Sequence, residues 1–478
     1  MTAPRTFETD VPQRLDRLPW SRWHWWIVVA LGVTWILDGL EVTIVGAMGG
    51  VLTQPGTLGL GEAEVGLTAS AYLAGTVAGA LVFSYLTDRQ GRKRWFLVTL
   101  ALYLTATIAT AFSWDLASFM AFRFLTGAGI GGEYSAINSA IDELIPARAR
   151  GHTDLAINGS WWLGTILGAL ASLPLLNPRL VPEALGWRLC FGLGSVLGLG
   201  ILLVRRFVPE SPRWLVLQGR TQEAERIVRA IEEEVRRTRG GEPLPEPSGT
   251  LRIRPHPGSH FGTVARELLR VYPRRSVLGI ALMASQSFLY NAIFFTYALV
   301  LSRFYGVPSG RIGLYLLPFA LVNFCGPLVL GRLFDTVGRR AMITFTYAAS
   351  AGLLALTGAL FWSGRLDATT QTLAWSAVFF FASAGASSAY LTVSEVFPLE
   401  IRAMAIAFFF VVAQGVGTLA PWVFGWLIQT SATSVFLGYL LGAVAMGIGA
   451  GVAFAYAVPA EGRSLEDIAT PLAARDAE

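Results

Sequence analysis

The chain has 478 residues, of which 53% are hydrophobic and only 14% are charged, against about 25% in a typical soluble domain. This number of charges is too small to cover the surface of a soluble protein of this length. The sequence therefore predicts an all-α integral membrane protein. Lys93 is the only lysine and lies in a polar loop, which excludes a phosphate-binding P-loop and a Schiff-base lysine within a span.

Twelve apolar stretches are each long enough to cross the roughly 30 Å of membrane hydrocarbon. The predicted spans lie near 24–49, 65–87, 95–113, 116–144, 154–176, 187–207, 276–301, 312–333, 341–362, 373–395, 404–428 and 435–457. A polar insert separates the first six from the last six. The sequence therefore predicts two six-helix bundles, 24–207 and 276–457, joined by a linker over 208–275.

The basic residues are distributed unequally between the two sides of the predicted membrane. With the N-terminus inside, 31 of the 37 Lys and Arg residues fall on the cytoplasmic side, five fall outside, and Arg123 lies within a span. This follows the positive-inside rule, so we expect the tails, 1–23 and 458–478, and the linker in the cytoplasm of a multi-pass cell-membrane protein. The polar first 23 residues predict no cleavable signal peptide.

The linker contains a predicted amphipathic helix. Its apolar residues recur at helical spacing and are Ala224, Ile227, Val228, Ile231 and Val235. The stretch 241–259 that follows is rich in proline and glycine, so we expect a flexible link there.

Two short motifs occur once in each half. The segment 84–93 (SYLTDRQGRK) after the second span matches 331–340 (GRLFDTVGRR) after the eighth, at an offset of 247 residues. A second pattern, Glu-x-x-Pro-x-x-x-Arg, begins at Glu143 and again at Glu395, at an offset of 252 residues. Matched order and side indicate duplication, and two parallel repeats about an axis along the membrane normal are a transporter architecture.

These repeated loops resemble the major facilitator superfamily, whose commonest signature is Asp-x-x-Gly-Arg-Arg/Lys. The stretches 209–215 (PESPRWL), 461–466 (EGRSLE) and 123–134 (RFLTGAGIGGEY) are similar to the sugar-porter and synaptic-vesicle-protein-like branches. The stretch 38–41 (DGLE) is similar to the organic-acid and phosphate symporters. The resemblance implies a twelve-helix transporter, and the single Gln286, where sugar porters have two glutamines, disfavours a sugar as cargo.

Span four carries a glycine pattern, Gly127-x-Gly129-x-x-Gly132, that formally matches the dinucleotide-binding fingerprint. That fingerprint needs a strand before it and a helix after it, whereas this copy lies within an apolar span. Small residues at such spacing let helices approach closely. We therefore expect close helix packing here and no bound nucleotide.

The repeated loops place matched acids and arginines at the cytoplasmic ends of the spans. An Asp that faces an Arg across the interface of the halves can hold this side closed while the transporter opens outward. We expect exposed ion pairs of ~0–1 kcal/mol each, because a gate must open in every cycle; solvated loops without a gating role are the alternative. The predicted gate residues are Asp88, Arg92, Glu143 and Arg150 in the first half and Asp335, Arg339, Glu395 and Arg402 in the second.

Four ionisable residues lie within the predicted spans and away from their edges: Asp38, Glu41, Arg123 and Glu133. Such groups are costly in a membrane and are candidates for function. A rise of 1.5 Å per residue places Asp38 roughly 21 Å and Arg123 roughly 20 Å from the inner face, which predicts an Asp38–Arg123 pair. A carboxyl in a cavity can carry a proton, and the resemblance to symporters implies Asp38 and Glu133 as proton sites. A fixed structural ion pair is the alternative.

Polar and aromatic side chains near the middle of other spans are predicted to contact the substrate, because such sites lie between the two repeats. Gln286 and Tyr290 are four residues apart, so one helix face presents both to the same cavity. The predicted substrate residues are Tyr134, Asn138, Asn158, Trp161, Gln286, Tyr290, Asn291, Tyr297, Asn323, Tyr390 and Gln414. Interhelical hydrogen bonding is the alternative for each.

The sequence therefore predicts a proton-coupled symporter of a small polar metabolite, preferably an aromatic or carboxylic acid that Arg123 can meet. A facilitator or exporter of a sugar-like or cationic solute and a membrane sensor on a transporter fold are the alternatives. We expect no enzyme, cofactor or metal site, because the sequence offers no nucleophile–base pair and no zinc-binding histidine spacing. The expected partners are the substrate, protons and membrane lipid, without nucleic acid, and the chain is expected to be a monomer.

Overall fold

The computed structural model describes residues 6–205, 208–247, 249–253, 261–307 and 309–475. In the first half the membrane-length segments are α2 (Arg22–Leu52), α3 (Glu62–Gln90), α4 (Arg92–Ala111), α5 (Leu116–Leu144), α6 (Arg150–Gly159) with α7 (Trp161–Leu175), and α8 (Glu183–Arg205). In the second half they are α12 (Pro273–Tyr305), α13 (Ser309–Thr336), α14 (Arg339–Trp362), α15 (Ala368–Glu395), α16 (Arg402–Thr430) and α17 (Ala432–Tyr456). Twelve helical segments can therefore be traced in the described ranges.

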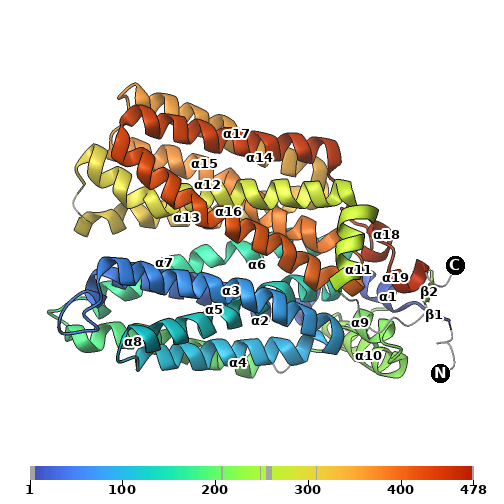
Figure 1. Cartoon of the computed structure of the whole chain (residues 1–478). Helices are drawn as coiled ribbons and strands as arrows, with labels where there is room; N and C mark the ends of the chain where they lie inside the picture. The colour runs from blue at the N-terminus through green and yellow to red at the C-terminus, as the bar shows by residue number, and fades with distance from the viewer. Residues whose placement is uncertain (1–5, 206–207, 248, 254–260, 308, 476–478) are drawn as a thin grey trace.

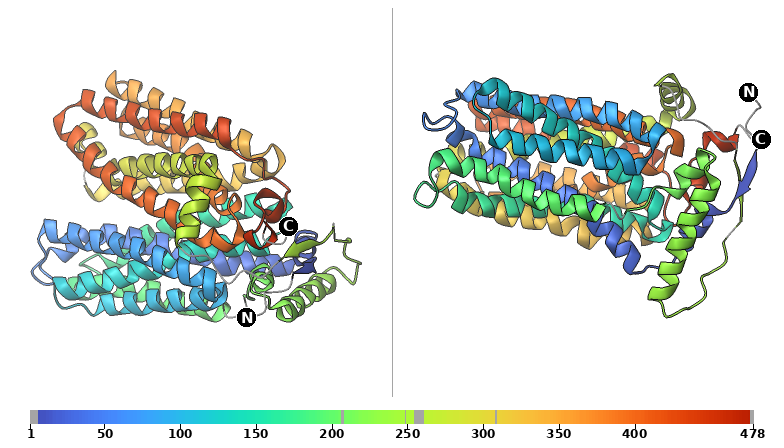
Figure 2. Two further views of the ribbon diagram at one scale, coloured as in Figure 1. Left: turned by 45° about the vertical axis from the view of Figure 1, so that its right-hand side comes forward. Right: turned by 90° about the horizontal axis from the view of Figure 1, so that it is seen from below.

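The two halves form two helical bundles that lie side by side, with the first half below and the second above in Figure 1. The left view of Figure 2 shows the same arrangement, and in the right view, from below, the first half lies in front of the second. Nine helices in the described part of the chain are apolar and long enough to cross a membrane. These features confirm the predicted all-α fold of twelve helices in two bundles.

The fifth predicted span differs from the expectation, because it starts four residues earlier and is interrupted. It begins at Arg150 and breaks at Ser160, between α6 and α7. The Ser160 hydroxyl donates to the carbonyl of Ile157 at 2.6 Å and to that of Gly32 at 3.2 Å. Side-chain hydroxyls that bond to nearby carbonyls commonly bend helices, and here the bend presents Trp161 as the first residue of α7.

Glycines bring α3 and α5 into close contact, as the sequence predicted. A Cβ atom on Gly127 would overlap the carbonyl oxygen of Tyr72, and one on Gly131 would overlap that of Thr76. Gly129 likewise lies against Thr99 of α4. Only glycine permits such approach of backbones, so the glycine pattern is a packing surface.

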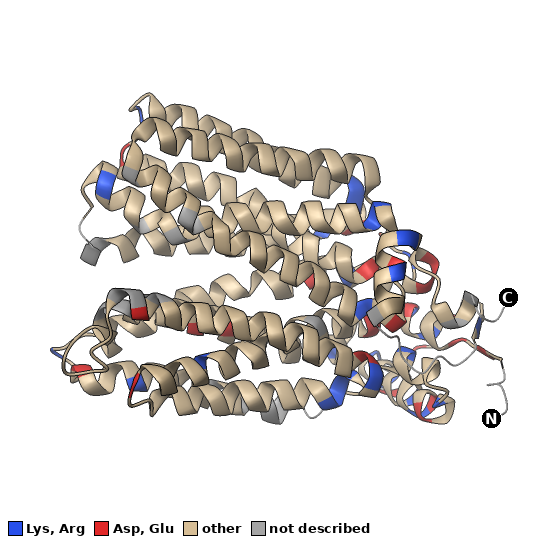
Figure 3. Ribbon diagram, viewed as in Figure 1, with Lys and Arg blue, Asp and Glu red and all other residues tan. Residues whose placement is uncertain are grey.

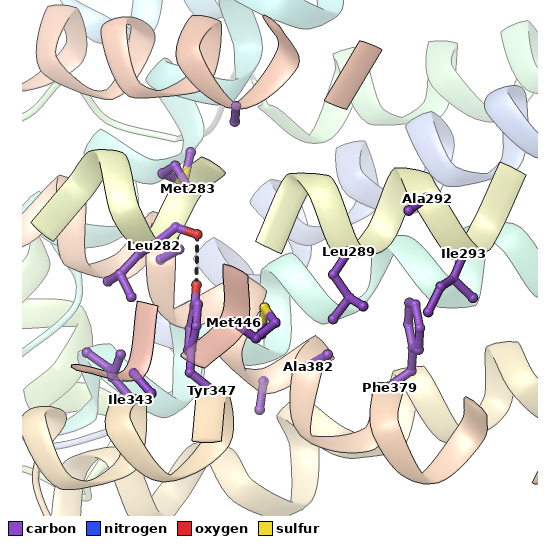
Figure 4. Packing of buried hydrophobic residues seen from close by; sticks show 14 of the residues in the cluster. Leu282, Met283, Leu289, Ala292, Ile293, Ile343, Tyr347, Phe379, Ala382 and Met446 are labelled. Atoms are coloured by element: carbon purple, nitrogen blue, oxygen red, sulfur yellow. Dashed lines mark hydrogen bonds between the residues drawn. The ribbon is translucent and has the colours of Figure 1, made fainter. Parts of the chain in front are cut away.

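The core of the second half is built from side chains of α12, α14, α15 and α17. Figure 4 shows Leu282, Met283 and Leu289 facing residues of the neighbouring helices. The buried Tyr347 hydroxyl donates to the carbonyl of Leu282 at 3.0 Å, so its polar atom has a partner. Buried polar groups are normally paired in this way.

Short elements gather at the end of the bundles where both termini lie (Figure 1). They are β1 (Phe7–Thr9), α1 (Val11–Asp16), a 3₁₀ turn (Ala147–Ala149), α9 (Pro212–Leu217), α10 (Thr221–Thr238), β2 (Leu251–Ile253), α11 (Phe261–Arg266), a π-helical turn (Glu267–Val271), a second 3₁₀ turn (Leu399–Ile401), α18 (Leu465–Ile468) and α19 (Leu472–Arg475). The predicted amphipathic helix is α10, with Ala224, Val228, Ile231 and Val235 buried.

The predicted flexible link over 241–259 is ordered in part, because β2 pairs antiparallel with β1 of the N-terminal tail. Phe7 lies opposite Ile253, and Thr9 lies opposite Leu251. Position 248 and the stretch 254–260 lie outside the described residues. The tail and the linker therefore form one small folded unit.

Charged residues gather at the end of the molecule that carries the termini, whereas the middle of the helices is almost free of them (Figure 3). We call this end the inner end and the opposite end the outer end. The arginine distribution predicts that the inner end faces the cytoplasm.

Candidate functional site

A cavity of about 450 Å³ lies between the two halves. Its lining reaches Leu52 and Val65 at the outer ends of α2 and α3. Eight of the eleven predicted substrate residues line it: Tyr134, Asn158, Trp161, Gln286, Tyr290, Asn291, Tyr390 and Gln414. Both halves contribute to the lining, as expected of a site between two repeats.

Asp38 lies in the cavity wall and accepts hydrogen bonds from three different helices. The Tyr72 hydroxyl donates to Oδ1 at 2.8 Å. The Tyr134 hydroxyl and the Trp161 Nε1–H donate to Oδ2 at 2.8 and 2.7 Å. Gly39 makes the last contact feasible, because a Cβ there would overlap the carbonyl oxygen of Trp161 and hold α7 away.

Arg123 forms its ion pair with Glu41, so the predicted Asp38–Arg123 pair is wrong. Glu41 lies about one turn beyond Asp38 on α2, and its longer side chain reaches the guanidinium. The Thr107 hydroxyl lies 3.3 Å from the second carboxylate oxygen of Glu41. The guanidinium also lies over the ring of Tyr72, 4.3 Å from its centre. Tyr72 therefore touches both the Asp38 carboxylate and the arginine.

Glu133, the fourth predicted ionisable residue, is buried away from the central cavity. It lines a separate cavity of about 10 Å³ whose wall also includes Asp38 and Trp35. This space is at the lower limit for one water molecule. A role for Glu133 in proton transfer remains a prediction.

Three predicted substrate residues, Asn138, Tyr297 and Asn323, do not line the cavity. Asn138 donates to the carbonyl one helical turn before it at 2.8 Å, and Tyr297 donates to the carbonyl of Tyr315 at 3.0 Å. Asn323 accepts a hydrogen bond from Tyr290 at 3.3 Å. Their polar atoms are bound within the protein, so the prediction of direct contact is corrected for these three.

Several cavity residues were not predicted from the sequence, and Tyr72 is the most informative of them. Trp35, Ser287, Ser383 and Ser387 also line the cavity. Serines and aromatic residues are common throughout membrane helices, so nothing in the sequence distinguished these positions. A tyrosine in the middle of the apolar second span was the one available signal for Tyr72.

The predicted gate residues converge at the inner end, where their side chains are at most 6% exposed. Each half has one arginine that binds both its own Asp and its own Glu. Arg92 lies 3.2 Å from Asp88 and 3.1 Å from Glu143, and Arg339 lies 2.8 Å from Asp335 and 3.1 Å from Glu395. We call these residues, with Arg150 and Arg402, the inner gate. The expectation of exposed pairs is wrong, because the two halves enclose them.

The aspartates of the inner gate bind backbone N–H groups of the opposite half. Asp88 accepts from the N–H of Met404 at 3.1 Å, at the start of α16. Asp335 accepts from the N–H of Gly151 at 3.1 Å and of His152 at 2.8 Å, at the start of α6. A carboxylate is favoured at a helix N-terminus, where the free N–H groups point outward. The expected direct Asp–Arg contact between the halves is thus replaced by helix capping.

Glutamates complete the contact between the halves. Arg150 lies 3.6 Å from Glu395, and Arg402 lies 4.0 Å from Glu143. With the capping aspartates, these contacts close the inner end, while the cavity extends toward the outer end.

The motifs beyond the sixth and twelfth helices support the inner gate. Glu210 accepts from the backbone N–H of Arg92 at 2.9 Å, and burial raises the pKa of this glutamate. The Trp214 indole donates to the carbonyl of Asp88 at 2.9 Å. Arg213 binds Glu466 at 2.5 Å, so the tail after α17 is tied to the linker.

Comparison with known proteins places the chain among transporters. Residues 46–471 match the profile of the sugar (and other) transporter family. The niacin transporter of Acinetobacter baylyi is 28% identical over 414 residues, or 86% of this chain and 89% of that one. The 4-hydroxybenzoate transporter of the same organism is 31% identical over 231 residues, or 48% of this chain and 49% of that one.

Solved structures share the fold. The proton:xylose symporter bound to 6-bromo-6-deoxy-D-glucose superposes with a TM-score of 0.77 at 19% identity, over 93% of this chain and 98% of that one. The inward-open xylose transporter from E. coli gives a TM-score of 0.61 at 17% identity, over 92% of this chain and 98% of that one. The chain is a multi-pass cell-membrane transporter, and it belongs to the sugar (and other) transporter family of the major facilitator superfamily.

Proposed function

We propose that this transporter imports a small aromatic carboxylate together with protons. The observation that carries the proposal is the contact of Tyr72 with both Asp38 and Arg123 in the wall of the central cavity. One side chain thus joins a carboxylate that can take up a proton to the cation that can bind an anionic substrate.

Asp38 has one oxygen that suits a proton better than the other. Its Oδ2 accepts from the Trp161 N–H, which can only donate. Its Oδ1 accepts from the Tyr72 hydroxyl, which can rotate and accept instead. When Oδ1 is protonated, the Tyr72 hydroxyl can therefore rotate and accept that proton in a hydrogen bond. The hydrogen bonds from Tyr134 and Trp161 to Oδ2 stay intact.

The second acid controls whether Arg123 is available. In the described structure its guanidinium is paired with Glu41. Protonation of Glu41 releases this pair, and a carboxylate of the substrate can then take the vacated donors as a charge-assisted bond. Proton uptake at Asp38 and Glu41 thus favours binding of an anion, which is the requirement for symport.

The cavity suits a small ring. Its wall carries Trp35, Trp161, Trp162, Phe294 and Tyr390, and aromatic pairs contribute roughly 0.5–1.5 kcal/mol beyond area burial. Niacin and 4-hydroxybenzoate, named for two relatives, are both aromatic carboxylic acids. The relatives and the cavity therefore support the same class of cargo.

Purified protein in liposomes tests this proposal. An inward gradient of about two pH units supplies roughly 2.7 kcal/mol per proton, so nicotinate or 4-hydroxybenzoate should accumulate up to ~100-fold for one coupled proton. Asp38→Asn should abolish this accumulation and leave exchange of internal for external substrate intact. Asp367→Asn, an exposed N-cap at the outer end, is the control and should behave like the unmodified protein.

Two results would contradict the proposal: uptake of a bound substrate that is independent of the gradient, or normal accumulation by Asp38→Asn. A cationic cargo is the second candidate, because Arg123 and Glu41 neutralise each other and leave the charge of Asp38 unbalanced in the cavity. Gradient-driven export of an organic cation such as tetraphenylphosphonium, without uptake of either acid, would favour it.

A further inference from the structure

Two buried acids at the inner end belong neither to the cavity nor to the inner gate. Asp142 lies near the end of α5 and Asp154 lies in α6, and both residues are 0% exposed. Within the described part of the chain, no hydrogen bond of good geometry reaches their four carboxylate oxygens, although the Ser394 side chain lies beside Asp142 and the Asn158 side chain lies beside Asp154. A buried acid with no well-formed hydrogen bond is unusual and requires an explanation.

The internal repeat shows that the inner gate does not need these acids. The gate contains four acids and four arginines, two of each from either half. The offset of 252 residues that relates Glu143 to Glu395 places Ser394 at the position of Asp142 and Ile406 at that of Asp154. The first half therefore carries two acids in excess of a balanced set, and the second half has no equivalent.

The surroundings of the two acids are crowded with charges of both signs. Asp142 is influenced by Arg402, Glu395 and Arg150, and Asp154 by Asp142, Glu395 and Arg339. In the described residues none of these arginines lies within ion-pair distance of either acid, because Glu143, Glu395, Asp335 or Asp16 binds them instead. Other charged or titratable groups at the inner ends of the packed elements are partly or fully exposed in five cases, Arg22, Arg89, Lys93, Arg94 and Arg332, and the rest are His24, Asp88, Arg92, Arg148, His152 and Asp335.

The cost of burying charge determines whether Asp142 and Asp154 are neutral or ionised when the inner end is closed. An ionised carboxylate without a partner is expensive to bury, whereas a neutral carboxylic acid is much less so. Asp142 and Asp154 also lie near each other and near Glu395, so ionisation would add like-charge repulsion to the desolvation cost. Separation of the halves would admit water to this region and remove both penalties.

We propose that Asp142 and Asp154 form a proton-binding site beside the inner gate, separate from the acids of the central cavity. Two neutral carboxylic acids permit the halves to close at the inner end. Loss of their protons to the water of the cytoplasm favours the open inner end, and the protons return before the gate closes again. The site acts without cargo and therefore goes beyond the proposed function.

Distance measurements between spin labels test this site. Arg94→Cys at the start of α4 and Thr336→Cys at the end of α13 place labels at exposed inner-end positions in opposite halves. Cys190→Ala and Cys325→Ala remove the two native thiols. In substrate-free protein, a rise in pH should shift the distances from a short to a long population. Release of two protons changes the ratio of populations by up to ~100-fold per pH unit.

Asp142→Asn combined with Asp154→Asn should keep the short distance at every pH, because amides stay neutral. Asp142→Ser combined with Asp154→Ile, which copies the residues of the second half, provides a second test if the first variant fails to fold. His152→Gln is the control for the histidine at the interface, whose ring lies 2.9 Å from Asp335, and this variant should retain the response to pH.

A substitution in the central cavity distinguishes the proposed site from the acids of that cavity. Asp38→Asn should retain the pH response of the distances, whatever it does to uptake. A response that persists in both neutral variants of Asp142 and Asp154 overturns the proposal. So does a response that disappears in His152→Gln or in Asp38→Asn, because the proton would then bind elsewhere.

Discussion

At the scale of single residues, the candidate site depends on how three hydrogen-bond donors and one cation are shared between two acids. The sequence could predict that Asp38, Glu41 and Arg123 matter, because ionisable groups in apolar spans are rare. It could not predict the pairing. Depth along the helix was equal for Asp38 and Arg123, but side-chain length and the donors on three other helices decided in favour of Glu41.

Tyr72→Phe tests the link between the two acids. The substitution keeps the ring against Arg123 and removes the hydrogen bond to Asp38. A hydrogen bond to a charged group is worth about 1.5–3 kcal/mol, so kcat/KM for gradient-driven uptake should fall roughly 10- to 100-fold.

Tyr297→Phe is the matched control, because Tyr297 was predicted to bind substrate but lies outside the cavity. Loss of the Tyr297 hydroxyl should change kcat/KM for uptake by less than about threefold, which corresponds to roughly 0.7 kcal/mol. Equal effects of the two substitutions on uptake would show that the hydroxyl of Tyr72 has no special role.

At the scale of elements, helices were predictable and short strands were not. Apolar runs of about 20 residues mark the spans, and the 3.6-residue period marked α10. The strands β1 and β2 have three residues each and pair across more than 240 residues of sequence, so no local period indicates them. The break at Ser160 was equally hidden, because it depends on the carbonyl of Gly32 in another helix.

The contact between the N-terminal tail and α10 should depend on pH. Burial alone raises the pKa of Glu232, but hydrogen bonds from Arg14 and Arg17 outweigh it and place the pKa below the ordinary value of 4.5. A lowered carboxyl pKa stabilises the folded contact above the unfolded value, and this stability is lost as pH falls through the folded one.

Hydrogen exchange of the segment 6–17 measures this contact. Glu232→Gln should raise its exchange rate at neutral pH roughly tenfold or more, because the charge-assisted bonds to Arg14 and Arg17 are lost. Glu233→Gln is the control, since Glu233 is exposed and pairs with Arg236 on its own helix. Identical exchange in the two variants would contradict the role assigned to Glu232.

At the scale of the whole molecule, the two repeated halves meet at a closed inner end and enclose a cavity that extends outward. The repeat itself, the twelve helices and the gathering of the eight matched acids and arginines at one end were readable from sequence spacing, whereas their role as a gate stays a prediction. The burial of these side chains could not be predicted from the sequence, because their exposure to solvent depends on how the two halves pack against each other. A closed inner end with an occupied proton site is one state of an alternating-access cycle, and the central claim is that protons and substrate cross together.

Proton entry driven by substrate tests that claim most directly. Liposomes that contain the protein and a trapped pH indicator, with equal pH on both sides, receive nicotinate or 4-hydroxybenzoate on the outside. We expect the interior to acidify as substrate enters, at a rate that matches substrate uptake, and we expect no acidification with Asp38→Asn. Substrate entry without acidification, beyond that of protein-free liposomes, would contradict it.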